Sequence, residues 1–125
     1  MAAQAIIFFA HGSSVETANE AVRKVAAEAA RQAGVERYAV AFLELAQPTL
    51  EQAAETLIAE GVDRIAVVPY FLTLGIHLQR DLPALVKRIA AARPDIQVSV
   101  TPPLDGHPGL AGVLADRARN AKWES

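Results

Sequence analysis

The sequence of 125 residues contains no cysteine. This absence excludes disulfide bonds, thiolate zinc sites, cysteine nucleophiles and cysteine-ligated iron–sulfur clusters. Any metal ion must therefore be held by His, Asp or Glu side chains.

An excess of charge of one sign is also missing. The net charge is -2 at pH 7 and charged residues make up 21% of the chain. No clustered basic stretch is present of the kind that neutralises phosphates, so we expect no nucleic-acid partner. No G-x-G-x-x-G or G-x-x-x-x-G-K-[ST] sequence occurs, which argues against a nucleotide cofactor.

Long hydrophobic runs are absent as well. No apolar run reaches the roughly 18 residues of a membrane span, and the N-terminus has no basic region typical of a secretory signal peptide. We therefore expect no membrane partner and a cytoplasmic location. A chain of 125 residues that is 52% hydrophobic is long enough for one domain with a real core, over residues 1–125.

Short apolar runs alternate with segments of helical periodicity along the whole chain. This alternation predicts an α/β fold, a four-stranded parallel sheet covered by helices on both faces. The simplest strand order is flavodoxin-like, with the first strand between the second and the third. The predicted strands are 5–10, 38–43, 65–69 and 96–100, and the predicted helices are 14–33, 48–60, one beginning at 77 or 81, and one opening at 108.

Capping signals mark the helix ends. Ser13 and Glu16 have the spacing of a capping box, as do Thr49 and Gln52. Gly34 stands where a left-handed C-cap is preferred.

The third helix contains a proline, Pro83. Because proline suits only the first turn of a helix, this helix is expected to begin near His77 or Asp81.

The first helix has one apolar stripe, formed by Val15, Ala18, Val22, Val25 and Ala29.

Three potential metal ligands follow three predicted strands. His11 ends the first strand in the stretch AIIFFAHGSS, Glu44 closes the second, and His77 lies one loop beyond the third. The carboxyl ends of parallel strands form the edge where ligands bind, so these side chains are expected to converge. Two imidazoles and a carboxylate suit a divalent transition metal such as Co, Ni or Fe. Taken singly, each histidine is also explained as a capping or hydrogen-bonding residue, and Glu44 as a solvated one.

Other polar residues have simpler explanations. His107, in DGHPG, is interpreted as an N-cap ahead of Pro108 and is left out of the metal set. Ser13 and Ser14 are interpreted as caps. Histidine phosphatases carry an Arg before the histidine that follows their first strand, and this chain has Ala10 there, which argues against phosphoryl transfer.

The segment after the third strand is unusually apolar for a loop. It contains four apolar or aromatic side chains that either line a flat cavity or pack a subunit interface. These are Tyr70, Phe71, Leu72 and Leu74.

Three blocks of sequence resemble a known family. They are AHGSS, FLELAQPTL, and PYFLTLGIH followed by RDLP. Together, over the first three-quarters of the chain, they resemble the small class II tetrapyrrole chelatases of the CbiX type, the sirohydrochlorin cobaltochelatase and ferrochelatase family.

The resemblance implies an enzyme, a lyase of cobalamin or sirohaem biosynthesis, with a chelatase-type α/β fold. Its substrates would be sirohydrochlorin and a divalent metal, Co2+, Fe2+ or Ni2+. By motif, His11 and His77 would hold the metal, with Glu44 as a further ligand. Longer relatives contain two such domains, so a homodimer is expected for this chain. The printed sequence ends NAKWES, so we expect no histidine-rich tail of the kind found in some relatives.

A mechanism follows as a hypothesis. A neutral imidazole can hold a metal or accept a proton at cellular pH, so His11 and His77 would do both in turn, assisted by Glu44. The wall for the ring would be Tyr70, Phe71 and Leu72. The carboxylates of the ring would meet helix N-termini at Ser13 and near Arg80, although Arg80 is equally explained as a solvated charge. The alternative function is a non-catalytic carrier of metal or tetrapyrrole.

Overall fold

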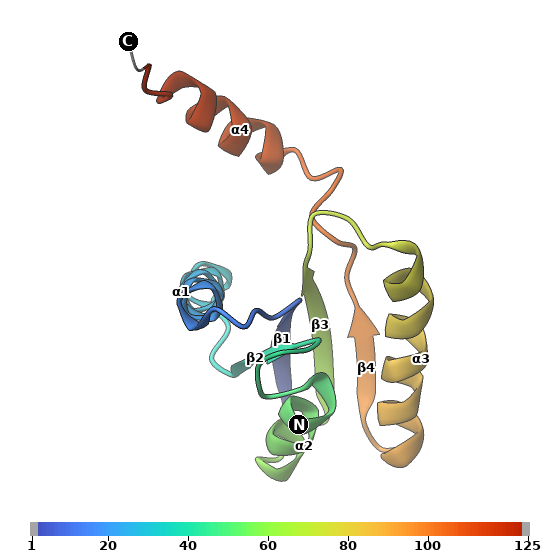
Figure 1. The fold of residues 1–125 in the computed structure, drawn as a ribbon. Helices are drawn as coiled ribbons and strands as arrows, with labels where there is room; N and C mark the ends of the chain where they lie inside the picture. Colours follow the sequence, from blue (N-terminus) through green and yellow to red (C-terminus); the bar gives the residue numbers. More distant parts are fainter. Residues whose placement is uncertain (1–2, 124–125) are drawn as a thin grey trace.

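The computed structural model describes residues 3–123 and has the predicted α/β fold (Figure 1). Its four strands form one parallel sheet in the order β2-β1-β3-β4, so the first strand lies between the second and third as expected. The elements are β1 (Gln4–Ala10), α1 (Glu16–Ala33), β2 (Tyr38–Phe42), α2 (Leu50–Ala59), β3 (Arg64–Tyr70), α3 (Ile76–Ala92), β4 (Gln97–Val100) and α4 (Gly109–Arg119).

The three strands that lead to the candidate site end level with one another. Ala10, the last residue of β1, pairs with Phe42 at the end of β2 and with Tyr70 at the end of β3. The loops that follow these strands therefore start from the same edge of the sheet.

One face of the sheet carries the core. Side chains alternate between the two faces of a strand, and those of one set are almost fully buried beneath α2 and α3. The strand residues of this core include Ala5, Ile7, Phe9, Ala41, Ile65 and Val67, and the helices contribute Leu50, Ala53, Ala54, Leu57, Ile58, Leu82, Val86 and Ile89.

The opposite face is covered only in part. α1 packs on it through Asn19, Ala26 and Ala30, whereas Val15 and Val25 of the predicted apolar stripe are 58% and 50% exposed. α4 points away from the sheet (Figure 1), and none of its residues is buried. The coverage of both faces that a parallel sheet normally has is therefore incomplete here.

The first helix begins later than predicted. α1 starts at Glu16, its N-cap is Val15, and no side chain caps it. The predicted capping box is wrong because the Oγ of Ser13 accepts the N–H of Val15 instead (3.0 Å). The C-cap prediction is confirmed, since Gly34 has a φ of 70° and its N–H donates to the carbonyls of the last turn.

The second capping box is confirmed, because Thr49 and Gln52 each accept the other's backbone N–H. The third helix begins at one of the two expected places, but its proline does not lie in the first turn as predicted. α3 begins at Ile76, close to His77 rather than at Asp81, and Pro83 lies inside it. Proline in a helix removes one N–H donor. The burial of Leu82 and Val86 on either side shows that packing holds the helix together across this gap.

All four strands differ from the prediction by one residue at one or both ends, since β1 begins at Gln4 and β2 ends at Phe42. β3 includes Arg64 and Tyr70, so Tyr70 belongs to the strand and not to the loop, and β4 begins at Gln97.

Within residues 3–123, no helix combines the length and the apolar character needed to cross a membrane.

Candidate metal site

Two of the three predicted ligands lie side by side at the carboxyl edge of the sheet. The Nε2 of His11 is 2.9 Å from the Oε1 of Glu44, and the two side chains are 59% and 56% exposed. Parallel pairing continues past the strand ends, because Leu43 donates its N–H to Ala10 and Glu44 donates its N–H to the carbonyl of His11. The backbone thus fixes the imidazole and the carboxylate next to each other, open to solvent.

Gly12 allows the loop after β1 and the loop after β2 to approach this closely. Its φ is +93°, a left-handed conformation that favours glycine. A Cβ at this position would lie 1.8 Å from the backbone oxygen of Glu44. Glycine is therefore required here on two independent grounds.

The loop that carries His11 is also held from below by Asn19. Asn19 is the one buried polar side chain among the described residues, at 2% exposed. Its Oδ1 accepts the N–H of Ser13 (2.9 Å), and its Nδ2 donates to the carbonyl of Ser13 (2.8 Å) and to Glu16 (3.1 Å). The sequence analysis missed this residue. A polar side chain at the spacing of the buried face of a helix was the available signal.

Phe71 supports the imidazole from the side. Its ring centroid is 6.3 Å from that of His11, in an edge-on arrangement, and 5.9 Å from that of Phe9. Phe71 thus links the site to the core below it, and it lies partly buried rather than open on the surface.

The third predicted ligand is not part of this pair. His77 lies in the first turn of α3, exposed, with its Nδ1 3.5 Å from the Nη2 of Arg80. The Nε of Arg80 also lies 3.7 Å from the Oδ1 of Asp81. Over residues 3–123, no group of three His, Asp or Glu side chains is close enough to hold a metal ion. The structure thus brings His11 and Glu44 together and leaves His77 on a neighbouring element.

The spacing of the His11–Glu44 pair suits a metal ion. Nitrogen and oxygen donors bind first-row metals at roughly 2.1 Å. Two donors at right angles on one octahedral ion are then about 3.0 Å apart. The observed 2.9 Å is close to this separation, and it is also the length of an ordinary N–H···O hydrogen bond. The pair can therefore become adjacent metal ligands once Nε2 is deprotonated and both lone pairs turn towards the ion.

The surface around the pair is apolar. The loops after β2 and β3 expose large hydrophobic side chains at the same edge, and two of them, Leu45 and Ile76, were not among the predicted residues. Leu45 also has a left-handed φ of 65°. The exposed set comprises Leu43, Leu45, Tyr70, Leu72 and Ile76.

Two helix N-termini reach the same edge without side-chain caps. These are the starts of α1, next to Ser13, and of α3, next to His77. Their free N–H groups and the helix dipole favour anions.

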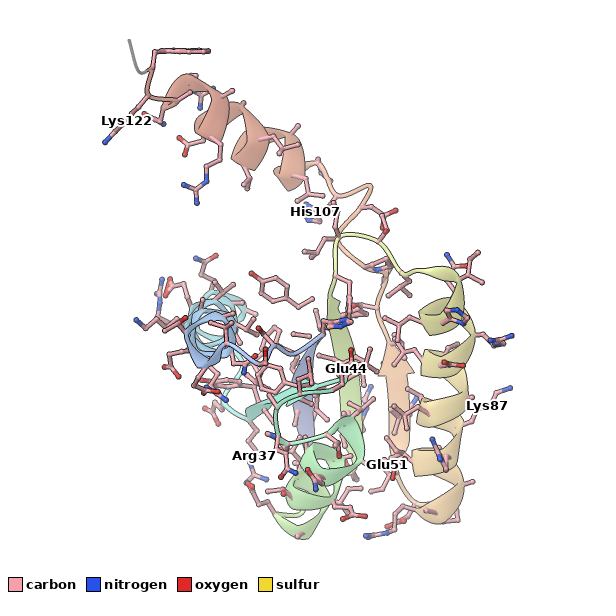
Figure 2. The ribbon with its side chains drawn as sticks, in the orientation of Figure 1. Arg37, Glu44, Glu51, Lys87, His107 and Lys122 are labelled. Carbon is pink, nitrogen blue, oxygen red and sulfur yellow. The ribbon has the colours of Figure 1, made fainter. Side chains whose placement is uncertain are left out.

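His107 lies apart from the site, at the foot of α4, whereas Glu44 lies near the middle of the molecule (Figure 2). The Nδ1 of His107 accepts the N–H of Gly109 at 2.8 Å. The N-cap of α4 is Pro108, however, so the predicted N-cap lies one residue too early, although His107 does bond to the start of the helix. Its omission from the metal set is consistent with this bond.

Fold and site together define an α/β protein with an open imidazole–carboxylate pair at the carboxyl edge of a parallel sheet. Comparison with known proteins identifies the family within this class. The chain belongs to the CbiX family, whose sequence model matches residues 5–121.

Several relatives have established names. A sirohydrochlorin cobaltochelatase of Methanopyrus kandleri is 27% identical over 96% of this chain and 98% of its own length. A sirohydrochlorin ferrochelatase of Bacillus subtilis is 32% identical over 81% of this chain, which covers only 39% of that relative.

Two solved structures extend the likeness to the fold. A putative cobalamin biosynthesis CbiX protein from Marinobacter aquaeolei superposes with a TM-score of 0.82 and 32% identity, over 93% of this chain and 94% of that one. SirB from Bacillus subtilis, solved with Fe3+, superposes with a TM-score of 0.84 and 27% identity. In that comparison this chain is covered to 98% and spans 49% of the length of SirB.

Proposed function

We propose that this chain, as one CbiX-type domain over residues 1–125, inserts a divalent metal ion into sirohydrochlorin. The observation that carries the proposal is the exposed His11–Glu44 pair, set at the spacing of adjacent metal ligands. The names of the relatives supply the substrate class, since they are cobalt and iron chelatases of sirohydrochlorin. Co2+ and Fe2+ are accordingly the metals to test first, with Ni2+ third.

The first step is capture of the metal by His11 and Glu44. One neutral nitrogen and one carboxylate replace two of the waters of the ion and leave its other positions exchangeable. Both side chains are more than half exposed, so the ion remains accessible to an incoming ring. A weak, open pair suits a site that must release the metal to a better chelator.

The second step is proton removal. A divalent ion replaces two pyrrole N–H protons, so each insertion releases two protons, and the metallated ring has the same net charge as the free ring. Once the metal has passed to the ring nitrogens, His11 and Glu44 are free to accept these protons. His77 is proposed as the second imidazole, approaching from the first turn of α3 when the ring is bound.

The ring itself is proposed to lie on the apolar edge formed by Tyr70, Phe71 and Leu72. Sirohydrochlorin carries several carboxylates, and the uncapped helix N-termini next to Ser13 and His77 offer N–H groups to them. Arg80 adds a guanidinium at the second of these termini. It already contacts His77 and Asp81, so it is available for a ligand carboxylate only by exchanging those contacts.

We propose that the active form is a homodimer. In a single copy the His11–Glu44 pair lies on open surface, with nothing facing it to cover a flat ring. The SirB chain is about twice as long as the part this chain matches, which leaves room for a second unit opposite the first. A second copy of this chain would provide the equivalent wall.

The proposal is tested by single substitutions at the three proposed ligands. His11→Ala, His77→Ala and Glu44→Gln should each lower the rate of Co2+ insertion at limiting metal, measured by the change in sirohydrochlorin absorbance. Because these side chains are exposed, circular dichroism spectra and melting temperatures should remain unchanged. His107→Ala is the matched control and should keep the full insertion rate. Full activity of His11→Ala with both Co2+ and Fe2+ would contradict the assignment.

Measuring turnover distinguishes the chelatase from the second candidate function, a carrier of metal or tetrapyrrole. With sirohydrochlorin at a large excess over protein, a catalyst converts many rings per chain, above the rate of the protein-free mixture. A carrier stops at one equivalent per chain or per dimer.

A further inference from the structure

Leu45 has a left-handed backbone, with a φ of 65°, and it alone among the described non-glycine residues has a positive φ. For leucine this conformation is uncommon and strained, because the Cβ comes too close to the carbonyl oxygen. Asn and Asp offset part of this strain through local hydrogen bonds, which leucine cannot form. Residues with such a backbone persist where the surrounding structure holds them, and they cluster at functional sites.

Backbone hydrogen bonds fix the loop that carries Leu45. Pairing with β1 continues past the end of β2 as far as Glu44, whose N–H donates to the carbonyl of His11, and Leu45 is the next residue. The N–H of Phe42 donates to the carbonyl of Pro48 (2.9 Å), which joins the two ends of the loop. Leu45 therefore lies near the tip of a short closed loop with a defined path.

The side chain of Leu45 is directed to solvent. It is 65% exposed and does not belong to the hydrophobic core of the described residues. A hollow of about 270 Å³ lies beside the loop, lined in part by Phe42, Leu43 and Leu50, and Leu45 does not line it. Apolar surface is thus present next to the loop, yet Leu45 does not use it. Packing within residues 3–123 therefore does not explain why this leucine is held in a strained conformation.

Leu45 is next to the candidate metal site. Its Cα lies about 3.8 Å from that of Glu44, and Glu44 contacts His11. The nitrogens of a tetrapyrrole have to reach a metal held by this pair, and the ring spreads outwards from them in its own plane. A ring in that position passes close to Leu45.

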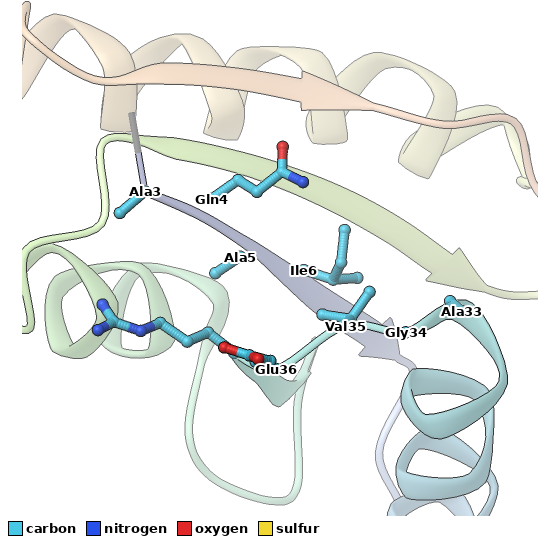
Figure 3. A pocket seen from close by; sticks show the side chains of 9 residues that line it. Ala3, Gln4, Ala5, Ile6, Ala33, Gly34, Val35 and Glu36 are labelled. Carbon is cyan, nitrogen blue, oxygen red and sulfur yellow. The ribbon is translucent and has the colours of Figure 1, made fainter. Parts of the chain in front are cut away.

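A ring has to be bound at this edge of the sheet and not at the other. A hollow of about 390 Å³ is bordered by Gln4, Ile6 and the end of α1, but it opens at the amino end of β1 (Figure 3). At about 3.3 Å per residue, His11 lies roughly 15–25 Å further along the strand direction. A ring held in that hollow does not reach the His11–Glu44 pair. The exposed apolar side chains beside the pair are the surface that remains for it.

We propose that Leu45 is a specificity-determining residue, which packs against the tetrapyrrole ring and is presented to it by the left-handed turn. The inference rests on the proposed function for the identity of the ring, and it deepens that function by adding a contact from the loop after β2. Because β1 lies between β2 and β3, Leu45 lies on one side of His11, and Phe71 and Leu72 lie on the other. The metal pair is then flanked by apolar contacts from two loops.

The size of the effect follows from the area that the ring covers. Covering much of an exposed leucine side chain removes on the order of 60 Å² of apolar surface from water. This area corresponds to about a tenfold change in the affinity for the ring. The affinity for the metal should not change, because Leu45 has no donor atom.

The first test measures ring binding in the absence of metal. Sirohydrochlorin is titrated into the native chain, Leu45→Asn and Leu45→Met, and its absorbance is followed. Leu45→Asn should bind the ring about tenfold more weakly and raise the KM for sirohydrochlorin by a similar factor, with kcat and Co2+ affinity unchanged. Leu45→Met is the matched control and should keep most of the affinity, since it retains an apolar side chain of similar volume. Unchanged ring affinity in Leu45→Asn, or equal losses in both variants, would overturn the proposal.

The second test asks whether Leu45 instead stabilises the fold or a contact between copies of the chain. Asparagine adopts the left-handed conformation more readily than leucine. Leu45→Asn should therefore not lower the urea midpoint of unfolding, and light scattering should give the molar mass of the native protein. A lower midpoint with a proportional loss of ring binding, or a change in molar mass, would overturn the role in ring binding.

The failure of this inference is distinguishable from that of the proposed function. A native chain that inserts metal, together with a Leu45→Asn variant of unchanged KM for sirohydrochlorin, would refute the role of Leu45 and keep the chelatase. A native chain that binds the ring through Leu45 without inserting metal would do the reverse.

Discussion

Replacing Asn19 by Ala should affect stability and activity together, because Asn19 connects the buried face of α1 to the loop after His11. The substitution removes three side-chain hydrogen bonds, two of them to the backbone of Ser13. Each bond contributes about 1 kcal/mol net, and a buried partner left unsatisfied costs about 1–3 kcal/mol. Since Ser13 is partly exposed, water replaces part of the loss. We therefore expect a decrease of about 2–4 kcal/mol in the free energy of unfolding.

The assay is urea unfolding followed by circular dichroism. The matched control is Asn120→Ala, because Asn120 is exposed and its side chain bonds only to Asp116 of its own helix. This control should change stability by less than about 0.5 kcal/mol. If Asn19→Ala cost no more than the control, the reasoning that Asn19 secures the loop would be refuted.

Asn19→Ala also tests whether Asn19 positions the His11–Glu44 pair. At a temperature where Asn19→Ala is still folded, a loosened loop should weaken the metal-binding pair, and an error of about 1 Å costs on the order of 100-fold in rate. Insertion should therefore fall well beyond the unfolded fraction. An activity loss equal to the fraction unfolded would assign Asn19 a purely structural role.

Three further predictions concern local features. Gly12→Ala should lower the free energy of unfolding by about 3 kcal/mol or more, because the φ of Gly12 is +93° and an added Cβ would meet the carbonyl oxygen of Glu44. Gly61→Ala is the control for backbone strain alone, since Gly61 has a φ of +96° and open space around it. Equal losses for the two variants in urea unfolding would contradict the contact with Glu44. Thr49→Ala should cost about 1 kcal/mol in the same assay through loss of the cap of α2. Hydrogen bonds from Arg23 and Asn19 hold the pKa of the Glu16 carboxyl below its ordinary value. This group therefore contributes stability above that ordinary pKa, and the contribution is lost as pH falls through the lowered pKa. Arg23→Gln should raise the pKa measured by NMR, and an unchanged titration would contradict the pair.

Local sequence signals predicted much of the fold. The alternation of apolar runs and helical periodicity gave the four strands, the parallel sheet and the central first strand. Thr49 with Gln52, and Gly34, marked helix ends correctly because their preferences are satisfied within a few residues. Ser13 with Glu16 failed since Asn19 and Arg23 compete for the same groups, and that competition depends on the packing of α1.

The candidate site was predictable in part for a similar reason. His11 and Glu44 follow adjacent strands of the sheet, and register alone brings them together. His77 lies one loop and one helix start beyond its strand, so its distance from the pair depends on the path of residues 71–75, which strand pairing does not determine. Asn19 was missed because its role is to bond a backbone that only the folded loop presents.

The place of His11 after the central strand has a consequence for rigidity. β1 is hydrogen-bonded along both sides, whereas β4 is an edge strand with most of its residues exposed. Amide hydrogens of β1 should therefore exchange slowest and those of β4 and α4 fastest. An ion arriving at the imidazole would meet a scaffold already ordered, with little entropy left to lose.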